Sequence, residues 1–183
     1  MVYTKDRINV FRTIVGELDS LNISVLEASL YGTKNGYCLD HIIISDHKGD
    51  PLELNKVQIQ DIELQITSSL EKDKLKPKLV KKKLPRHFLT LKKDTQIEIN
   101  HDMVNRWTQL DIKTADRPGL LSSICSVFAK NNASIKKARI STYGERAEDR
   151  FCISSLEETP FLKKSELDKL ISELKESLDF EAV

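Results

Sequence analysis

The sequence of 183 residues has few cysteines, few aromatic residues and almost no net charge. Its three cysteines are far apart and odd in number, so neither a disulfide framework nor a C-x-x-C zinc site is expected. A formal net charge of +1 gives no general affinity for nucleic acid or an anionic membrane. No apolar run approaches the roughly 20 residues of a membrane span, and the N-terminus lacks the apolar core of a signal peptide. We therefore expect a cytoplasmic protein with no membrane and no nucleic acid among its partners.

An internal repeat is the clearest feature of the chain. When the sequence is shifted by the distance from Asp6 to Asp116, two blocks align, with identities at Asp6/Asp116, Arg7/Arg117, Ile14/Ile124, Asn22/Asn132, Ser24/Ser134 and Ala28/Ala138. A shift of one residue in the following turn then aligns Asp40 with Asp149. Repeats of this kind predict two copies of one supersecondary unit.

Each copy has the same order of periodic segments. Apolar residues recur at helical spacing over 10–18 and 120–128, and again over 59–70 and 167–178. Alternating segments between these helices predict paired strands, with Asn35-Gly36 suited to a type I′ hairpin turn. Each of the first helices ends near an asparagine, Asn22 in copy one and Asn131 or Asn132 in copy two, that suits a left-handed helix cap. Asn55 to Gln58 resembles a capping box, and Ser165 is expected to begin the last helix in a similar way.

These segments predict an α+β protein of two ferredoxin-like β-α-β-β-α-β domains in tandem. The first domain is expected over residues 1–70 with its final strand from 86–100, and the second over 101–183 with a weak last strand at 180–183. Residues 71–85 are rich in lysine and are expected to form an extended linker. Copy two has a full first strand, whereas copy one has only Val2 to Thr4 before its Asp6-Arg7. We interpret this as a truncated first strand and the chain as a piece of something longer.

The loop Asp116-Arg117-Pro118-Gly119, which leads into Leu120-Leu121, is the best candidate for a ligand site. Proline suits the first turn of a helix, and glycine lets the backbone approach a ligand. Free N–H groups at the start of a helix favour a carboxylate, and Asp116 or nearby carbonyls could take the ammonium of an α-amino acid. A plain helix cap with a Pro-Gly turn explains the same residues, so both interpretations stay open.

The other polar candidates favour structural roles. His101-Asp102 is expected to be a surface turn, because a metal site needs further ligands that the sequence does not supply nearby. Asp40 and Asp149 are expected to be structural aspartates at the mouths of strands. No nucleophile with a base and no phosphate-binding glycine motif is found, so no catalytic residue and no metal ligand is predicted.

Two motifs resemble a known family. The run from Asp116 to Leu121, with Asn131 to Ile135 and Ala138 to Thr142, resembles an ACT domain. Leu84 to Phe88 and the run from Ala138 to Phe151 are similar to the C-terminal end of the bifunctional PII uridylyltransferase/uridylyl-removing enzymes. In copy one the resemblance covers Asp6-Arg7, but Asn9 replaces the glycine. The matching ligand-loop positions are then Asp116, Arg117, Pro118, Gly119, Leu120 and Leu121, with Asp6, Arg7 and Asn9 as an altered or supporting set.

The resemblance implies a regulatory region that senses an amino acid, glutamine in this family, and that controls nitrogen metabolism through the PII protein. The nucleotidyltransferase and the metal-dependent hydrolase domains have no match here, so this chain is expected to bind without catalysing. It is expected to need no cofactor of its own, the Mg²⁺ belonging to the parent enzyme. The alternatives are a free-standing ACT-repeat regulator for another amino acid and a non-binding oligomerisation module. A homodimer through sheet edges is also expected.

Overall fold

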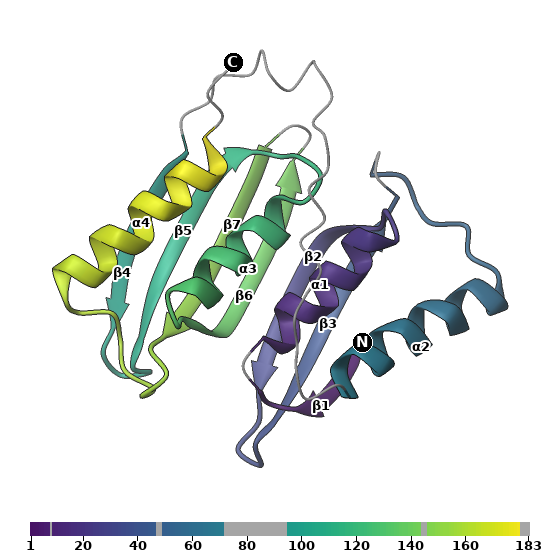
Figure 1. Cartoon of the computed structure of the whole chain (residues 1–183), viewed down its shortest axis with the longest axis horizontal. Coiled ribbons are helices and arrows are strands. Elements are labelled where there is room, and N and C mark those ends of the chain that lie inside the picture. The colour runs from purple at the N-terminus through teal and green to yellow at the C-terminus, as the bar shows by residue number, and fades with distance from the viewer. Residues whose placement is uncertain (8, 47–48, 72–94, 144–145, 180–183) are drawn as a thin grey trace.

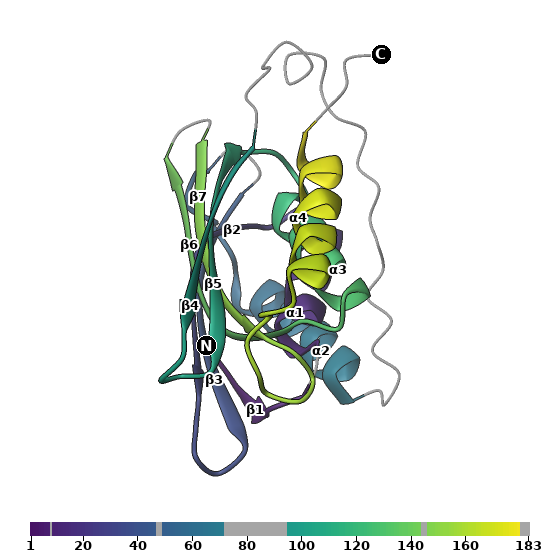
Figure 2. The same ribbon diagram turned by 90° about the vertical axis from the view of Figure 1, so that its left-hand side faces the viewer.

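The computed structural model describes residues 1–7, 9–46, 49–71, 95–143 and 146–179. These residues form two layers, a twisted antiparallel sheet and a row of four helices on one of its faces (Figures 1 and 2). The order of elements confirms the predicted repeat. Copy one contains β1 (Val2–Lys5), α1 (Val10–Ser20), β2 (Ser24–Gly32), β3 (Tyr37–Ser45) and α2 (Lys56–Glu71). Copy two contains β5 (Trp107–Ala115), α3 (Leu120–Lys130), β6 (Ser134–Tyr143), β7 (Arg146–Ser154) and α4 (Lys164–Leu178), and β4 (Gln96–Asp102) precedes it.

Alternation along the strands explains why one face of the sheet is covered by helices. In β5, Leu110 and Ile112 are almost fully buried, whereas Gln109 and Lys113 are only partly buried. Residues at alternate positions of a strand face opposite sides, so the apolar set lies under the helices and the polar set lies on the open face. The first strand of copy one is also shorter than that of copy two, since β1 has four residues and β5 has nine.

The helix ends follow the local sequence signals. Asn22 and Asn132 have φ angles of 57° and 54°, as predicted for left-handed caps. In each copy the next residue, Ile23 or Ala133, donates its N–H to a carbonyl five residues back, which completes a Schellman motif. Asn55 and Gln58 exchange reciprocal side-chain to backbone bonds of 3.0 Å at the start of α2, so the predicted capping box is confirmed.

Two local predictions are wrong. The loop at Asn35-Gly36 is not a type I′ turn, because only Gly36 has a positive φ and a type I′ turn needs two such residues. Instead Gly36 donates to the carbonyl of Thr33, and the N–H of Thr33 donates to the carbonyl of Tyr37, which gives a longer loop. Helix α4 begins at Lys164 with Lys163 as its N-cap, so Ser165 lies within the first turn.

Within the described residues, seven strands form one sheet in the order β1-β3-β2-β6-β7-β5-β4. The predicted assignment of 86–100 to the first domain is wrong for the described part of that segment, because β4 pairs with β5 of copy two from Gln96/Lys113 to Asp102/Trp107. A short turn over 103–106 joins β4 to β5, so this local hairpin forms in preference to a distant pairing with β1. Residues 72–94 and 180–183, which include most of the predicted linker and the weak last strand, lie outside the described residues.

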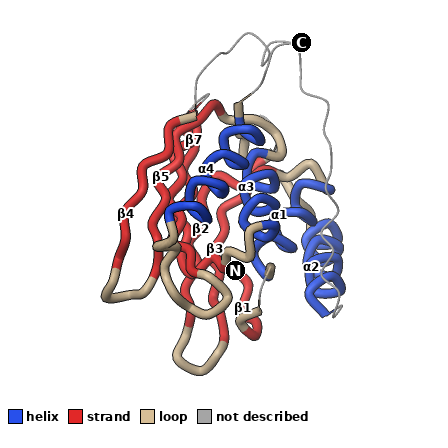
Figure 3. Tube along the Cα trace, turned by 60° about the vertical axis from the view of Figure 1, so that its left-hand side comes forward, coloured by secondary structure: helices blue, strands red, loops and turns tan. Residues whose placement is uncertain are grey.

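The two copies share a core at their junction. Strand β2 pairs with β6 through Glu27/Ser141, Ala28/Ile140 and Ser29/Arg139, and α1 packs beside α3 (Figure 3). Phe11, Val15, Ala28 and Leu30 of copy one belong to the hydrophobic cluster of copy two. A smaller cluster under α1 and α2 belongs to copy one alone. Because apolar side chains are buried across the junction, moving the copies apart would expose them to water.

Candidate functional site

The two loops that precede α1 and α3 have the same backbone conformation. Gly119 and Asn9 are the N-caps of these helices, with φ angles of 78° and 72°. Asparagine tolerates the left-handed region better than other non-glycine residues, which explains how Asn9 replaces the glycine without a change of shape. Pro118 lies before the N-cap, so its predicted place in the first helical turn is wrong. A Cβ atom at Gly119 would meet no other atom within 4 Å. Glycine is therefore favoured at this position because of the positive φ angle, and not because a side chain would clash.

The arginine of each loop binds the second helix of its own copy. Arg117 donates from Nη2 to the carbonyl of Ser177, 2.8 Å away, in the last turn of α4. Arg7 donates in the same way, from Nη2 to the carbonyl of Leu70 in the last turn of α2. A cation is favoured beside the exposed carbonyls at a helix C-terminus. This contact gives the repeated Arg7 and Arg117 a structural role whatever ligand the loops bind.

The aligned aspartates Asp40 and Asp149 lie within β3 and β7 and are buried, so the prediction that they sit at strand mouths is wrong. Burial, together with the nearby charge of Asp6, raises the pKa of Asp40 to about 6. Burial likewise raises the pKa of Asp149 to about 7, although an N–H bond from Ser141 opposes the shift.

The loop aspartate Asp116 has the same relation to Asp149 as Asp6 has to Asp40. Burial raises the pKa of Asp116, against the effect of Arg117, and the charge of Asp116 contributes to the raised pKa of Asp149. Each copy therefore holds one loop carboxyl close to one strand carboxyl on the helix-covered side of the sheet.

A small cavity, here called the junction cavity, lies where the copy-one loop meets copy two. Its lining comes from residues 6, 7 and 9–12 of the loop and α1, the end of β2, Cys38 and Asp40 of β3, the C-terminal part of α3 and residues 133–136. Its volume of about 40 Å³ exceeds the roughly 15 Å³ that one water needs. Residues 116–121 are not part of its lining, because antiparallel pairing of β2 with β6 puts the two loops at opposite ends of the junction.

Charges of both signs line the junction cavity. Asp6 and Asp40 supply carboxylates, and both oxygens of Asp40 are buried without a hydrogen-bond partner in the described part of the chain. Arg12 of α1 and Lys136 of β6 supply cations, and the buried Nε of Arg12 also has no partner among those residues. Burial lowers the pKa of Arg12. Unpaired buried groups of opposite sign can receive a ligand that carries both charges.

The structure thus brings together Asp6, Arg7 and Asn9, which the sequence ranked second, and it separates them from Asp116, Arg117, Pro118, Gly119, Leu120 and Leu121. Leu120 is 5% exposed and belongs to the core of copy two. The role of either loop in binding stays a prediction. Sequence reasoning missed Arg12 and Lys136, because each looks like an ordinary solvated residue until α1 packs against α3 and β2 pairs with β6.

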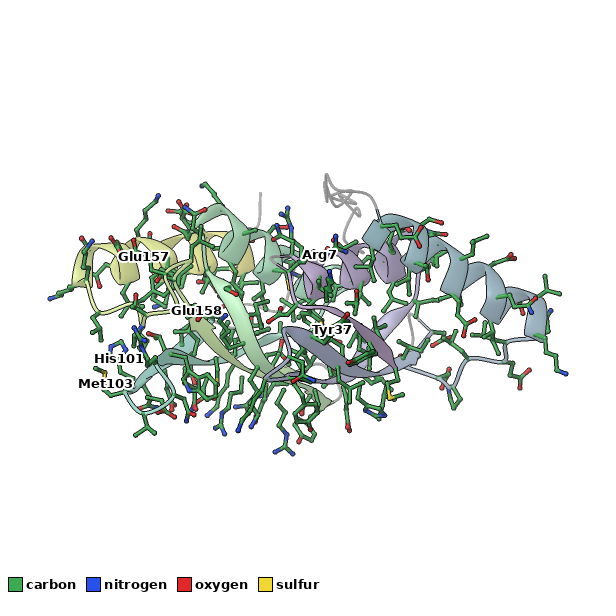
Figure 4. All side chains as sticks on the ribbon, turned by 90° about the horizontal axis from the view of Figure 1, so that it is seen from below. Arg7, Tyr37, His101, Met103, Glu157 and Glu158 are labelled. Carbon is green, nitrogen blue, oxygen red and sulfur yellow. The ribbon has the colours of Figure 1, made fainter. Side chains whose placement is uncertain are left out.

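The remaining polar candidates have structural partners. His101 and Asp102 are the last two residues of β4 and pair with Thr108 and Trp107, so the prediction that they form a surface turn is wrong. His101 Nδ1 lies 3.1 Å from the hydroxyl oxygen of Thr108, and Asp102 accepts bonds from the backbone and side-chain N–H groups of Asn105 in the turn that follows. His101 lies toward the outer edge of copy two, far from Arg7 (Figure 4). Within residues 1–7, 9–46, 49–71, 95–143 and 146–179, no group of three metal-binding side chains occurs and no helix is long and apolar enough to cross a membrane.

Comparison with known proteins gives a consistent family. Residues 108–163 match the ACT domain. The chain is 30% identical over 177 residues to the bifunctional uridylyltransferase/uridylyl-removing enzyme of Pseudomonas syringae pv. tomato, which covers 97% of this chain and 19% of that enzyme. Enzymes of the same name from Photobacterium profundum and Vibrio cholerae are 33% and 31% identical, over 89% and 96% of this chain and 18% and 20% of their own lengths. The chain therefore spans about a fifth of the length of these relatives.

Proposed function

We propose that this chain, whose residues 108–163 match the ACT domain and which is similar to part of the uridylyltransferase/uridylyl-removing enzymes, is an amino-acid-sensing regulatory region with glutamine as the ligand. In this proposal it acts on the activity of a parent enzyme that modifies the PII protein in the cytoplasm, and it has no catalytic role itself. The observation that supports binding is the junction cavity, which offers opposite charges between the two copies.

The position of the cavity provides a route from binding to regulation. Its walls come from the copy-one loop on one side and from α3 and β6 of copy two on the other. A ligand held by both walls favours the arrangement of the copies in which both contacts are made. A cavity of about 40 Å³ is smaller than glutamine, so binding would also move the loop before α1. The parent enzyme would respond to that movement.

Isothermal titration calorimetry of the chain with each of the common amino acids tests this proposal. We expect L-glutamine to bind, and Arg12→Gln to weaken that binding at least tenfold, since one lost charged hydrogen bond is worth roughly 1.5–3 kcal/mol. The matched control is Arg139→Gln, which removes an exposed arginine of β6 outside the cavity lining. Binding of a different amino acid would favour the free-standing regulator. Absence of any binding would favour the oligomerisation module.

The proposed dimer needs its own measurement. Strands β1 and β4 are the outermost strands of the described sheet, and an unpaired strand edge can pair with another chain. Light scattering coupled to size-exclusion chromatography should show a dimer, and Tyr3→Pro should disrupt it if β1 forms the contact. A monomer at all concentrations would contradict the proposed contact.

A further inference from the structure

Asp40 is the least explained charged group in the described chain. Its side chain is 1% exposed, and neither oxygen has a hydrogen-bond partner among the described residues. Burial of an ionised carboxylate without a partner is costly, so the ionised form needs a cation beside it. The aligned Asp149 differs, because it accepts a bond from the N–H of Ser141 and does not line the junction cavity.

The cations already present do not satisfy Asp40. Arg12 and Lys136 line the same cavity, yet neither forms an ion pair with Asp40 within the described residues. Lys136 instead forms a surface ion pair with Glu158, in which 3.1 Å separates Nζ from Oε1. The cavity therefore has an acidic part, formed by Asp6 and Asp40, and a separate basic part. A zwitterion is the class of ligand that carries one charge for each part.

We propose that Asp40, assisted by Asp6, receives the primary ammonium group of the ligand, while Arg12 receives its carboxylate. This assignment rests on the proposed amino-acid-sensing function. It makes the α-amino group, and not only the side chain, a condition of binding. It also gives Asn9 a place beside the ligand, because Asn9 lines the cavity next to Asp6.

The test compares L-glutamine with 4-carbamoylbutanoate, which has the same chain and carboxylate but no α-amino group. Calorimetry of the intact chain should show that glutamine binds at least tenfold more tightly. Asp40→Asn should lower the affinity for glutamine at least tenfold and leave the affinity for 4-carbamoylbutanoate unchanged. The matched control Asp149→Asn, at the aligned position of copy two and outside the cavity lining, should preserve the preference for glutamine.

Asp6→Asn is a second variant at an exposed position, so it tests the acidic part of the cavity if Asp40→Asn fails to fold. It should weaken glutamine without affecting the deaminated compound. If neither substitution changes the affinity for glutamine, Asp40 does not bind the ammonium group, whereas the proposed function is still supported. If another amino acid binds in place of glutamine and Asp40→Asn weakens it, the choice of glutamine fails and the role of Asp40 stands. Competition by potassium chloride at constant ionic strength would overturn the proposal in favour of an inorganic cation.

Discussion

Replacement of Asp149 by asparagine should stabilise copy two at pH 8. The side chain is 4% exposed, and burial raises its pKa from the ordinary 3.8 to about 7. Asparagine has nearly the same shape, cannot ionise, and keeps an oxygen that can accept the N–H of Ser141. The substitution therefore removes the cost of ionisation with little change in packing.

The sign and the size of this change in the free energy of unfolding follow from proton linkage. Below pH 3.8 the carboxyl is protonated in both states and costs nothing. Between pH 3.8 and about 7 the unfolded chain ionises first, so the free energy of unfolding falls as pH rises, and above pH 7 the loss is constant. A pKa shift of this size corresponds to roughly 4 kcal/mol of unfolding free energy. Because the structure relaxes around the charge, we expect the variant to gain about 2–4 kcal/mol.

Urea unfolding followed by tryptophan fluorescence measures the effect where it should occur. The single tryptophan, Trp107, begins β5, the strand in which Ile112 is the register partner of Asp149. The difference between variant and parent should be near zero at pH 4 and reach its full value at pH 8. Asp168→Asn, an exposed change in α4, is the control and should give a small difference that does not vary with pH. A constant difference for Asp149→Asn across this range would refute the reasoning.

Three further substitutions test the loop and the core by urea unfolding. Gly119→Ala should cost about 1–2 kcal/mol because φ is 78° there, whereas Gly119→Asn should cost less, since Asn9 adopts the same conformation; equal costs would contradict this account. Arg117→Gln should cost about 1.5–3 kcal/mol and speed amide exchange in the last turn of α4, through loss of the bond to Ser177, and unchanged exchange would count against that role. Leu110→Ala should cost about 2–5 kcal/mol because this side chain is 0% exposed, and a cost below 1 kcal/mol would show that the core closes around the gap.

The local elements could be predicted because their causes are local. The helix over Leu120–Lys130 follows from apolar spacing, and the cap at Asn132 follows from the tolerance of asparagine for positive φ. The structure adds that a Cβ atom at Gly119 would lie in open space, which the sequence does not indicate. Spacing along the chain gives the residue that a turn needs but not the atoms that surround it.

The sequence by itself determined the repeat, the type of each element and the residues that face the core, because periodicity and capping depend on neighbours along the chain. Only the tertiary structure decided that β4 joins copy two and that Arg12 meets a cavity together with Asp40. Strand pairing and burial depend on residues far apart in sequence, and the same local pattern is compatible with several partners. The junction between β2 and β6 selects one of them, and that choice places unpaired opposite charges around a single small space.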